Sequence, residues 1–490
     1  MRSTLPTLAA LIAAITLQFA ATRPLQGQIT AAEYAARRDS LAARVGNGVV
    51  LAFGGVTPLT DFGPFFQLPG FRYLTGYEYA DAALVMVVQE GRGSATLFVK
   101  RTAPRRSLYY GQEPDSAALA RELRLASRPI DQIQAVTDSL LRAGSGPLFE
   151  LRDFAAADFA TEDSLTRGGQ FVKALAARHP GLEVRDAHPI VDQLRARKSP
   201  AELALIRRAA EISAEGHLEL MRRIEPGMHE YDLQAILDYT FRRAGAERPA
   251  YGAIVGSGPL SLQLHYMKNR RAIQPGEVVV IDAGAEYRGY TADVTRTLPL
   301  NGTYTPEQRA IYQVARDAQA AAERNSQAGM SMAAARDSAT AVTARGLARL
   351  GLIESEEAVL DFPWNVDCNS RLLACGQVTL FTIHGITHGI GLEVHDPIQA
   401  YEDRIFKPGD AFVIEPGIYI SPTLLDLLPD TPRNRAFITK VRQKVQQYAN
   451  IGVRIEDSYV LTERGLERIS LAPREIDEIE TLIRRRSPVP

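Results

Sequence analysis

Residues 278–298 read VVVIDAGAEYRGYTADVTRTL, and this stretch says more about the fold than any other part of the chain. An apolar run ends in Asp282, a turn follows near Tyr287 and Arg288, and a second strand-like run carries Asp293. If the hairpin is symmetric about that turn, Asp282 lies directly opposite Asp293, with Cβ atoms ~5 Å apart. Two buried carboxylates so placed repel unless they share a proton or bind a cation. The stretch therefore predicts a β-hairpin with a cation site; solvated acids on a surface hairpin are the alternative, which the apolar run disfavours.

The pattern occurs a second time further along the chain. A Pro-Gly turn and an acid precede a buried strand, a carboxylate and a glycine in residues 275–284 (PGEVVVIDAG) and again in residues 408–417 (PGDAFVIEPG). Chance recurrence of common turn residues is the alternative. The agreement instead favours two related halves, which offer Asp282 and Glu415 from equivalent positions. Glu456 also ends an apolar strand-like run and is a further candidate for the same site.

Three of the eight histidines fall within residues 384–396, which read HGITHGIGLEVHD. A single histidine is more often a core or surface residue than a ligand. His384, His388 and His395 lie among glycines, which let the backbone approach a site closely. The segment therefore predicts that histidines join the carboxylates.

Charge arithmetic indicates how many cations such a site would hold. Four carboxylates (Asp282, Asp293, Glu415 and Glu456) and one neutral imidazole sum to −4, which two divalent ions balance. Oxygen-rich ligation favours manganese, with zinc, cobalt or iron as alternatives. Two such metals share a bridging water, lower its pKa to make hydroxide near neutral pH, and polarise a substrate carbonyl. This is the equipment of a hydrolase.

The bulk properties are those of a neutral globular protein. Among 490 residues, 56 Lys+Arg nearly cancel 57 Asp+Glu, so no basic field argues for nucleic acid or an anionic membrane. Residues 5–21 are almost entirely apolar and follow Arg2, which is the layout of a secretory signal peptide. We therefore expect a secreted or periplasmic mature protein. Cys368 and Cys375 either form a disulfide or remain two unpaired thiols.

Periodicity divides the rest of the chain into two domains. Helices are predicted over residues 31–45, 201–223, 230–244, 305–328 and 332–350. Strands are predicted over residues 48–53, 82–89, 94–99, 278–283, 291–298, 411–414 and 453–461. Ser199 and Glu202 form a capping-box pattern, which places the domain boundary just before the long helix. Residues 421–450 are polar and contain prolines, and they are interpreted as an insertion between two strands.

These residues together resemble the pita-bread metallopeptidases of family M24, specifically aminopeptidase P and its relative prolidase. The resemblance rests on the segments IDAG (281–284), TADVTRT (291–297), HGITHGIGLEVHD (384–396), VIEPGIY (413–419) and GVRIED (452–457). Residues 70–77 (GFRYLTGY) are similar to the family's creatinase-like N-terminal domain. Residues 364–376 and 421–450 differ from the compact forms of the family, which leaves the subsite shape and oligomer contacts open.

The resemblance implies a fold. We expect a signal peptide over residues 1–27 and an α/β creatinase-like N-terminal domain over residues 28–190. An α+β pita-bread catalytic domain with pseudo-twofold halves is expected over residues 195–475. A homo-oligomer, either a dimer or a tetramer, is implied in the same way.

The resemblance also implies roles for single residues. Asp282 would hold one metal, Asp293 and Glu456 would bridge the two, and His388 and Glu415 would hold the other. The remaining implied roles are proton transfer with the nucleophile by Glu415, a hydrogen bond from His395 to the substrate at the scissile bond, substrate binding by His265 and His384, and support of the carboxylates by Arg454. The implied activity is removal of an N-terminal residue that precedes proline in small peptides, with no membrane attachment of the mature form.

Other activities share parts of this pattern. A prolidase-type dipeptidase would use every ligand, and it differs only in how the substrate chain end is recognised. A methionine aminopeptidase would not need an N-terminal domain of this length. A non-catalytic binding protein or a metal-free creatinase-like enzyme would lack the ligands that this chain retains.

Overall fold

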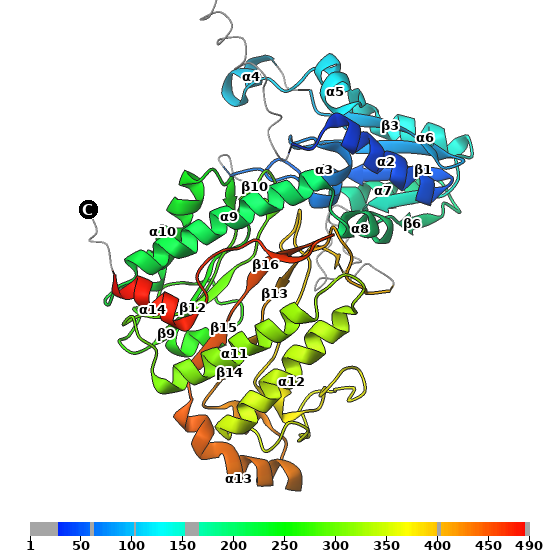
Figure 1. The fold of residues 1–490 in the computed structure, drawn as a ribbon. Helices are drawn as coiled ribbons and strands as arrows, with labels where there is room; N and C mark the ends of the chain where they lie inside the picture. The colour runs from blue at the N-terminus through cyan, green and yellow to red at the C-terminus, as the bar shows by residue number, and fades with distance from the viewer. Residues whose placement is uncertain (1–27, 59–62, 102–103, 152–165, 399–402, 486–490) are drawn as a thin grey trace, which may run out of the picture.

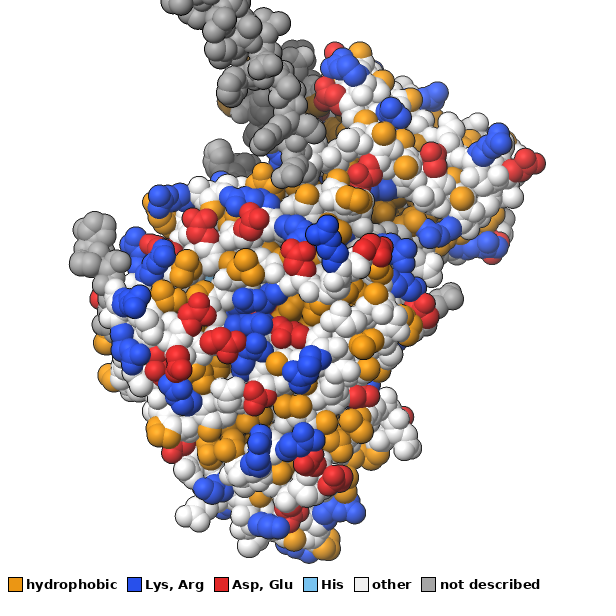
Figure 2. All heavy atoms as spheres, viewed as in Figure 1, with side chains coloured by type: hydrophobic (Ala, Val, Ile, Leu, Met, Phe, Trp, Pro, Cys, Tyr) orange, Lys and Arg blue, Asp and Glu red, His pale blue; other side chains and the backbone are white. Residues whose placement is uncertain are grey.

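The computed structural model describes residues 28–58, 63–101, 104–151, 166–398 and 403–485. The signal peptide predicted over residues 1–27 lies outside them. A smaller sheet domain precedes a larger domain, in which strands lie between pairs of long helices (Figure 1). Among the described residues, no helix combines the length and apolarity that a bilayer crossing requires. On the face shown in Figure 2, basic and acidic side chains are interspersed rather than gathered by sign.

The N-terminal domain is built on a six-stranded mixed sheet in the order β4-β3-β2-β1-β5-β6. Its strands are β1 (Gly48–Phe53), β2 (Ala83–Gln89), β3 (Arg92–Val99), β4 (Ala126–Pro129), β5 (Leu148–Leu151) and β6 (Val184–Asp186). The central strand β1 reads GVVLAF and is buried throughout, because alternate residues face hydrophobic clusters on both sides of the sheet. The predicted strand over residues 48–53 is therefore confirmed.

Helices cover both faces of this sheet. They are α2 (Ala31–Val45), α3 (Pro69–Thr75), α4 (Pro104–Tyr110), α5 (Ser116–Leu123), α6 (Ile133–Arg142), α7 (Arg167–Arg178) and α8 (His188–Ala196), with the 3₁₀ turn η1 (Ile130–Gln132). Leu41 of α2 belongs to the cluster on one face, and Leu175 of α7 belongs to the cluster on the other. The arrangement is the predicted α/β domain.

The larger domain consists of two halves with the same order of elements, a helix pair and then antiparallel strands. The first half contains α9 (Pro200–Arg223), α10 (Glu230–Arg243), β7 (Arg248–Pro249), β8 (Ile254–Ser257), η2 (Gly258–Leu262), β9 (Val278–Asp282), β10 (Ala285–Tyr287), β11 (Tyr290–Thr291) and β12 (Thr295–Pro299). The second contains α11 (Pro306–Arg324), α12 (Met332–Leu350), η3 (Gln377–Leu380), β13 (Ala411–Ile414), β14 (Gly417–Ile420), η5 (Leu424–Leu427), α13 (Pro432–Gln447), β15 (Ile451–Arg454), β16 (Asp457–Thr462) and β17 (Gly465–Arg468), and α14 (Ile476–Arg484) follows.

Local signals explain where these elements begin. Ser199 accepts a hydrogen bond from the Glu202 amide, and the Glu202 carboxylate accepts one from the Ser199 amide, so the predicted capping box starts α9. The two repeated Pro-Gly turns each precede a strand, β9 and β13. Gly276 and Gly409 have φ of +83° and +97°, a backbone region that favours glycine. The repeat therefore reflects equivalent turns in the two halves.

The hairpin that carries Asp282 differs from the expected register. Its turn is centred on Arg288 and Gly289, which both have positive φ, one residue later than predicted. Thr295 consequently lies opposite Asp282, and Asp293 falls beside Gly284 instead. A Cβ on Gly284 would lie 1.8 Å from the carbonyl oxygen of Ala292, so only glycine fits there. The glycine after the arginine was the signal for the correct register.

Two predicted strands are also interrupted. The run predicted over residues 291–298 divides into β11 and β12, and the run over 453–461 divides into β15 and β16. Asp293 lies in the first interruption and Glu456 in the second. The breaks were not predicted, because apolar periodicity continues through both positions although the ladders do not.

The segment over residues 421–450 is a folded part of the larger domain. It forms η5 and α13, and Phe437, Val441 and Val445 are buried in that domain's main cluster. Asn434 of α13 donates a hydrogen bond to the carbonyl oxygen of Asp361, in the loop that carries the two cysteines. Cys368 and Cys375 form a disulfide, which decides between the two alternatives that the sequence left open.

Candidate active site

Carboxylates and histidines converge where the two halves of the larger domain meet. Three groups each have potential ligand atoms within 4.8 Å of one another: Asp282, Asp293 and Glu456; His388, Glu415 and Glu456; and Asp293, His388 and His395. Because the groups share members, they form one continuous cluster. The five predicted ligand positions thus lie together, although the sequence separates the first and last of them by 174 residues.

Strand pairing explains how the acids meet. Thr295 and Glu456 form an isolated antiparallel bridge, which joins β12 of the first half to the break before β16 in the second. Within the second half, the pairs Ile414–Asp457 and Gly417–Arg454 belong to one register. That register places Glu415 across from Glu456. The acids therefore project from strand ends and breaks, where the ladder leaves their side chains free to converge.

His388 is held by its own backbone next to β13. The Val413 amide donates to the carbonyl oxygen of His388 at 2.9 Å, and the Glu415 amide donates to that of Ile386 at 2.8 Å. His388 Nδ1 lies 3.0 Å from the carbonyl oxygen of Gly389, so Nδ1–H donates there and Nε2 faces the cluster. Nε2 is 3.5 Å from Glu415 Oε1. Burial and the nearby His395 lower the pKa of His388 to about 3, so the imidazole is neutral.

Three of the acids, Asp293, Glu415 and Glu456, form no ion pair with a lysine or arginine in the part of the chain that the structure describes; their nearest basic groups are histidines. Burial, with the charges of Glu456 and Asp282, raises the pKa of Asp293 well above its usual range. Burial also raises the pKa of Glu456 and of Glu415, and neighbouring carboxylates add to both shifts. Glu456 Oε1 is buried without a hydrogen-bond partner among the described residues. This donor set of oxygens and one neutral imidazole fits divalent cations.

Asp282 behaves differently from the other three acids. Arg454 donates to Asp282 Oδ2 at 2.6 Å and to the Tyr419 hydroxyl at 2.9 Å. Burial opposes ionisation of Asp282, but Arg454 and the Tyr251 hydroxyl hold its pKa below the usual value. His384 Nε2 lies 2.8 Å from the Tyr419 oxygen, so the predicted brace, Arg454, links His384 to the metal-site carboxylate through a tyrosine.

Tyr251 was missed by sequence reasoning. Its hydroxyl donates to Asp282 Oδ1 at 2.6 Å and also contacts Asp293 Oδ1. Burial and the charges of Asp282 and Asp293 raise the pKa of Tyr251 well above 10, so it remains a donor. Tyr251 lies in the turn between β7 and β8, and no charge or periodicity marks it as functional.

The remaining predicted site residues surround the opening of the cluster. The His395 ring is exposed, and its centroid lies 4.2 Å from that of His388. His265 is exposed in the loop after η2, close enough that its charge contributes to the lowered pKa of His395, for which burial is the larger cause. Burial, followed by Arg454, lowers the pKa of His384 to about 4.

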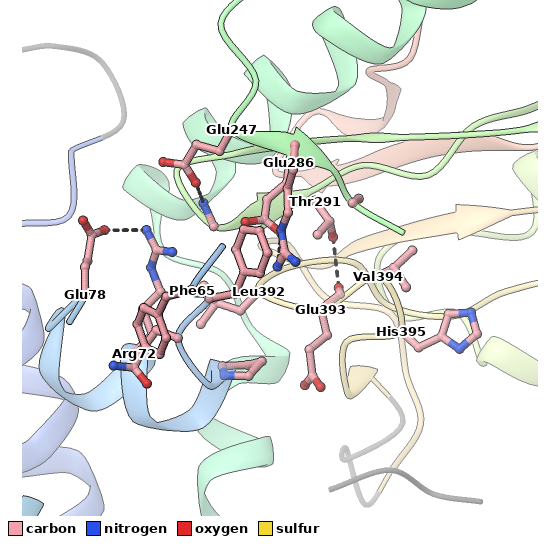
Figure 3. A pocket seen from close by; sticks show the side chains of 16 residues that line it. Phe65, Arg72, Glu78, Glu247, Glu286, Thr291, Leu392, Glu393, Val394 and His395 are labelled. Carbon is pink, nitrogen blue, oxygen red and sulfur yellow. Dashed lines mark hydrogen bonds and ion pairs between the residues drawn. The ribbon is translucent and has the colours of Figure 1, made fainter. Parts of the chain in front are cut away.

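A cavity of about 680 Å³ begins beside His395 and runs between the two domains. Figure 3 shows Glu393, Val394 and His395 on one side of it and Arg72 of the N-terminal domain on the other; Leu392, which also lines it, packs against the hydrophobic cluster of the N-terminal domain. Ala250, the neighbour of Tyr251, also lines it. The cavity is large enough for part of a peptide, and it meets the cluster at His395, which has a ring nitrogen within 4.8 Å of ligand atoms of Asp293 and His388.

Comparisons with known proteins agree over both domains. Residues 204–463 match the metallopeptidase family M24, and residues 34–149 match the aminopeptidase P N-terminal domain. An Xaa-Pro aminopeptidase of Escherichia coli (strain K12) is 31% identical over 93% of this chain and 98% of its own length. An Xaa-Pro aminopeptidase of Haemophilus influenzae is 31% identical over 86% of this chain and 89% of its own.

Solved structures show the same two-domain arrangement. Proline aminopeptidase P II from Yersinia pestis superimposes with a TM-score of 0.76 at 31% identity, covering 93% of this chain and all of that one. Aminopeptidase P from Escherichia coli, solved with the inhibitor Pro-Leu, gives a TM-score of 0.75 at 30% identity, over 93% of this chain and 98% of that one.

Proposed function

This chain belongs to metallopeptidase family M24, and we propose that it is an Xaa-Pro aminopeptidase, which removes the N-terminal residue from peptides with proline in second position. The observation that carries the proposal is the convergence of Asp282, Asp293, His388, Glu415 and Glu456 on one point. The curated relatives named above, similar over nearly the whole chain, are Xaa-Pro aminopeptidases, which favours this activity over a prolidase-type dipeptidase.

The five residues are proposed as ligands of two divalent metal ions. Asp282 would hold one ion, Asp293 and Glu456 would be shared by both, and His388 and Glu415 would hold the other. The oxygen-rich donor set favours manganese. When bound, the ions polarise the substrate carbonyl and lower the pKa of the water that attacks it. Burial of the acids without a cation partner supports this assignment.

The chain's own residues would supply binding and proton transfer. Glu415 is suited to accept a proton from the attacking water, because burial raises its pKa well above the usual range and so makes the carboxylate a stronger base. His395 stands exposed at the mouth and would donate a hydrogen bond at the scissile bond. His265 and His384 would bind the peptide beyond it. Arg454 would keep Asp282 ionised and orient Tyr419.

Peptide hydrolysis with a panel of metals tests the activity. Metal-stripped protein, reloaded with manganese, zinc, cobalt or iron, is assayed on an Xaa-Pro-Yaa tripeptide and an Xaa-Pro dipeptide. We expect release of Xaa from the tripeptide, the highest rate with manganese, and no activity for Glu415→Ala. Cleavage of the dipeptide alone would support a prolidase instead, and a folded protein that neither binds metal nor cleaves would support a binding protein.

Export and assembly are part of the same proposal. The apolar run of residues 5–21 after Arg2 supports a cleaved signal peptide and a secreted or periplasmic enzyme. Mass spectrometry of the protein produced in a bacterial host should find a mature N-terminus near Gly27 in the extracytoplasmic fraction. Light scattering of that material is expected to give a dimer or tetramer; an uncleaved, cytosolic chain would contradict the export proposal.

A further inference from the structure

The junction between the two domains contains a buried cluster of charges that sequence analysis did not identify. Arg195, near the end of α8, donates to Asp396 Oδ1 at 2.7 Å, and Lys198, just before α9, donates to Asp396 Oδ2 at 2.7 Å. The three side chains are 6%, 2% and 1% exposed. Arg195 also donates to Glu393 Oε2 at 2.6 Å. Two cations from the domain junction are thus committed to one loop of the catalytic domain.

Lys198 is also held by hydrogen bonds to the backbone of the domain junction. Lys198 Nζ donates to the carbonyl oxygens of Arg195 and Ala196, at 2.9 and 3.3 Å, so all three of its protons have acceptors. The Lys198 amide donates to the carbonyl oxygen of Gly409, in the turn before β13. The junction is therefore joined to the catalytic domain by backbone as well as by charge.

The loop that receives these cations carries His395. Asp396 follows His395 directly, and its amide donates to the carbonyl oxygen of Gly389 at 2.8 Å. The Asp396 carboxylate lies against Gly391, where a Cβ would come within 2.6 Å of its Cγ. The side chain of Thr291 donates to the carbonyl oxygen of Glu393 at 3.0 Å. His395 thus lies in a short segment that is anchored at Glu393 and at Asp396.

The loop faces the cavity between the domains. Glu393, Val394 and His395 line the cavity between the domains (Figure 3). A loop with little regular hydrogen bonding has many conformations open to it, and displacement of a substrate-binding group by ~1 Å costs about a hundredfold in rate. Ion pairs buried behind Asp396 restrict that freedom, because moving the carboxylate would leave charges buried and unpaired.

We propose that Arg195 and Lys198 are positioning residues for catalysis, which place His395 through Asp396. The inference rests on the proposed function of His395 in peptide cleavage. It gives the domain junction a role in the reaction: the end of the N-terminal domain holds the loop that binds the scissile bond, in addition to forming one wall of the cavity.

The test compares Arg195→Gln and Lys198→Met with a matched control, Arg37→Gln, in the full metal-loaded enzyme. Arg37 of α2 is also 6% exposed and also pairs across the domains, with Glu202 of α9 at 3.2 Å, but it does not touch the loop. We expect kcat for an Xaa-Pro-Yaa tripeptide to fall about ten- to a hundredfold in the first two variants. KM and bound metal should change little, and Arg37→Gln should lose stability while keeping wild-type kcat.

A double-mutant cycle with His395→Ala separates positioning from general destabilisation. If Arg195 acts through His395, Arg195→Gln should cause no further loss of kcat in the His395→Ala background. Arg195→Lys keeps the charge and should fold even if Arg195→Gln does not. It should recover most of the wild-type kcat, and it should not change kcat in the His395→Ala background.

Several results would overturn the inference. Equal losses of kcat in Arg37→Gln and Arg195→Gln would show that domain docking alone matters, and losses that add to that of His395→Ala would show that Arg195 acts elsewhere. An inactive wild-type enzyme would instead refute the proposed function, so the two failures are distinguishable.

Discussion

Glu456 and Asp457 are neighbours in the chain, buried to a similar extent, and placed in opposite electrostatic surroundings. Glu456 faces Asp282 and Asp293, and its Oε1 has no hydrogen-bond partner among the described residues. Asp457, on the other side of the strand, accepts bonds from Arg296 at 2.7 Å, Ser470 at 2.8 Å, and Gln319 and Arg474, both at 3.1 Å. Alternation along a strand separates the two environments.

The different surroundings of Glu456 and Asp457 distinguish the proposed metal site from the ion pairs that stabilise the strands around it. Burial and the charge of Glu415 raise the pKa of Glu456, whereas Arg296, Arg468 and Arg474 outweigh burial and lower the pKa of Asp457. Arg296 is fully buried, and it also donates to the carbonyl oxygens of Thr295 and Glu456. Arginines thus do not neutralise Glu456, on the side of the strand where cations are proposed to bind. On the opposite side, arginines neutralise Asp457, and Arg296 also hydrogen-bonds to the backbone beside the proposed ligands.

The largest effect on activity is expected when Glu456, which forms no ion pair with any described arginine, is replaced by a neutral residue. Glu456→Gln should lower kcat/KM more than about a hundredfold, because even partners of metal ligands cost ten- to a hundredfold when they are lost. Metal content should fall, measured by elemental analysis. The metal-free variant should unfold at the same or a higher temperature than the metal-free wild type, since a repelling carboxylate is gone. Lower stability of the metal-free variant would contradict the comparison.

Neutralising the compensated acid should act on stability instead. Asp457→Asn leaves three arginines facing a buried amide and should cost about 3–5 kcal/mol in the free energy of unfolding. Denaturant titration of the metal-free protein measures this cost. The fraction that remains folded at low temperature should still bind metal. A stable Asp457→Asn protein that has lost its metal would show that Asp457 acts on metal binding and not only on stability.

Removing the shared hydroxyl of Tyr251 should have a moderate effect. Tyr251→Phe deletes a donor to two carboxylates, and a hydrogen bond to a charged group corresponds to about a tenfold change in an equilibrium constant. We expect metal affinity, measured by competition with a chelating dye, to fall by that factor while the fold is retained. No change in affinity would mean that the tyrosine only fills space beside the cluster.

The smallest effect is the dependence of metal-free stability on pH. The raised pKa values of Asp293, Glu415 and Glu456 mean that the folded protein binds protons more tightly than the unfolded chain does. Their contribution to stability therefore falls as pH rises from the usual carboxyl range, about 4, through the raised pKa values. Asp282 and Asp457, with lowered pKa values, contribute in the opposite sense, and their stabilisation is lost as pH falls through those values.

Thermal unfolding across this pH window, with chelator and with manganese, separates these contributions. The metal-loaded protein should lose the decline with rising pH, because cations replace the protons. Glu456→Gln, with one raised carboxyl removed, should flatten the decline in the metal-free protein. A decline that persists unchanged after metal loading would place its origin outside the cluster.

Part of the site could be predicted because its signals are local. The apolar runs before Asp282 and Glu415, with their shared Pro-Gly turns, marked both acids as strand ends, and β9 and β13 end as expected. The register of the hairpin was wrong because turn position was inferred from symmetry and not from Gly289, whose positive φ the two-residue turn requires. The acids still converge, since a shift by two residues keeps side chains on the same face.

The sequence by itself determined which residues are chemically capable of the reaction, the two halves that carry them, and, to within a few residues, the limits of the five helices it predicted, because burial period, turn residues and caps act over a few positions. Tertiary structure alone decided that Tyr251 bonds to two of the acids, that Arg296 and Asp457 support the ligand strands from behind, and that Arg195 and Lys198 reach Asp396. Those contacts join residues that lie from 31 to 201 positions apart in the chain, and only the packing of the strands and domains brings them within hydrogen-bond distance.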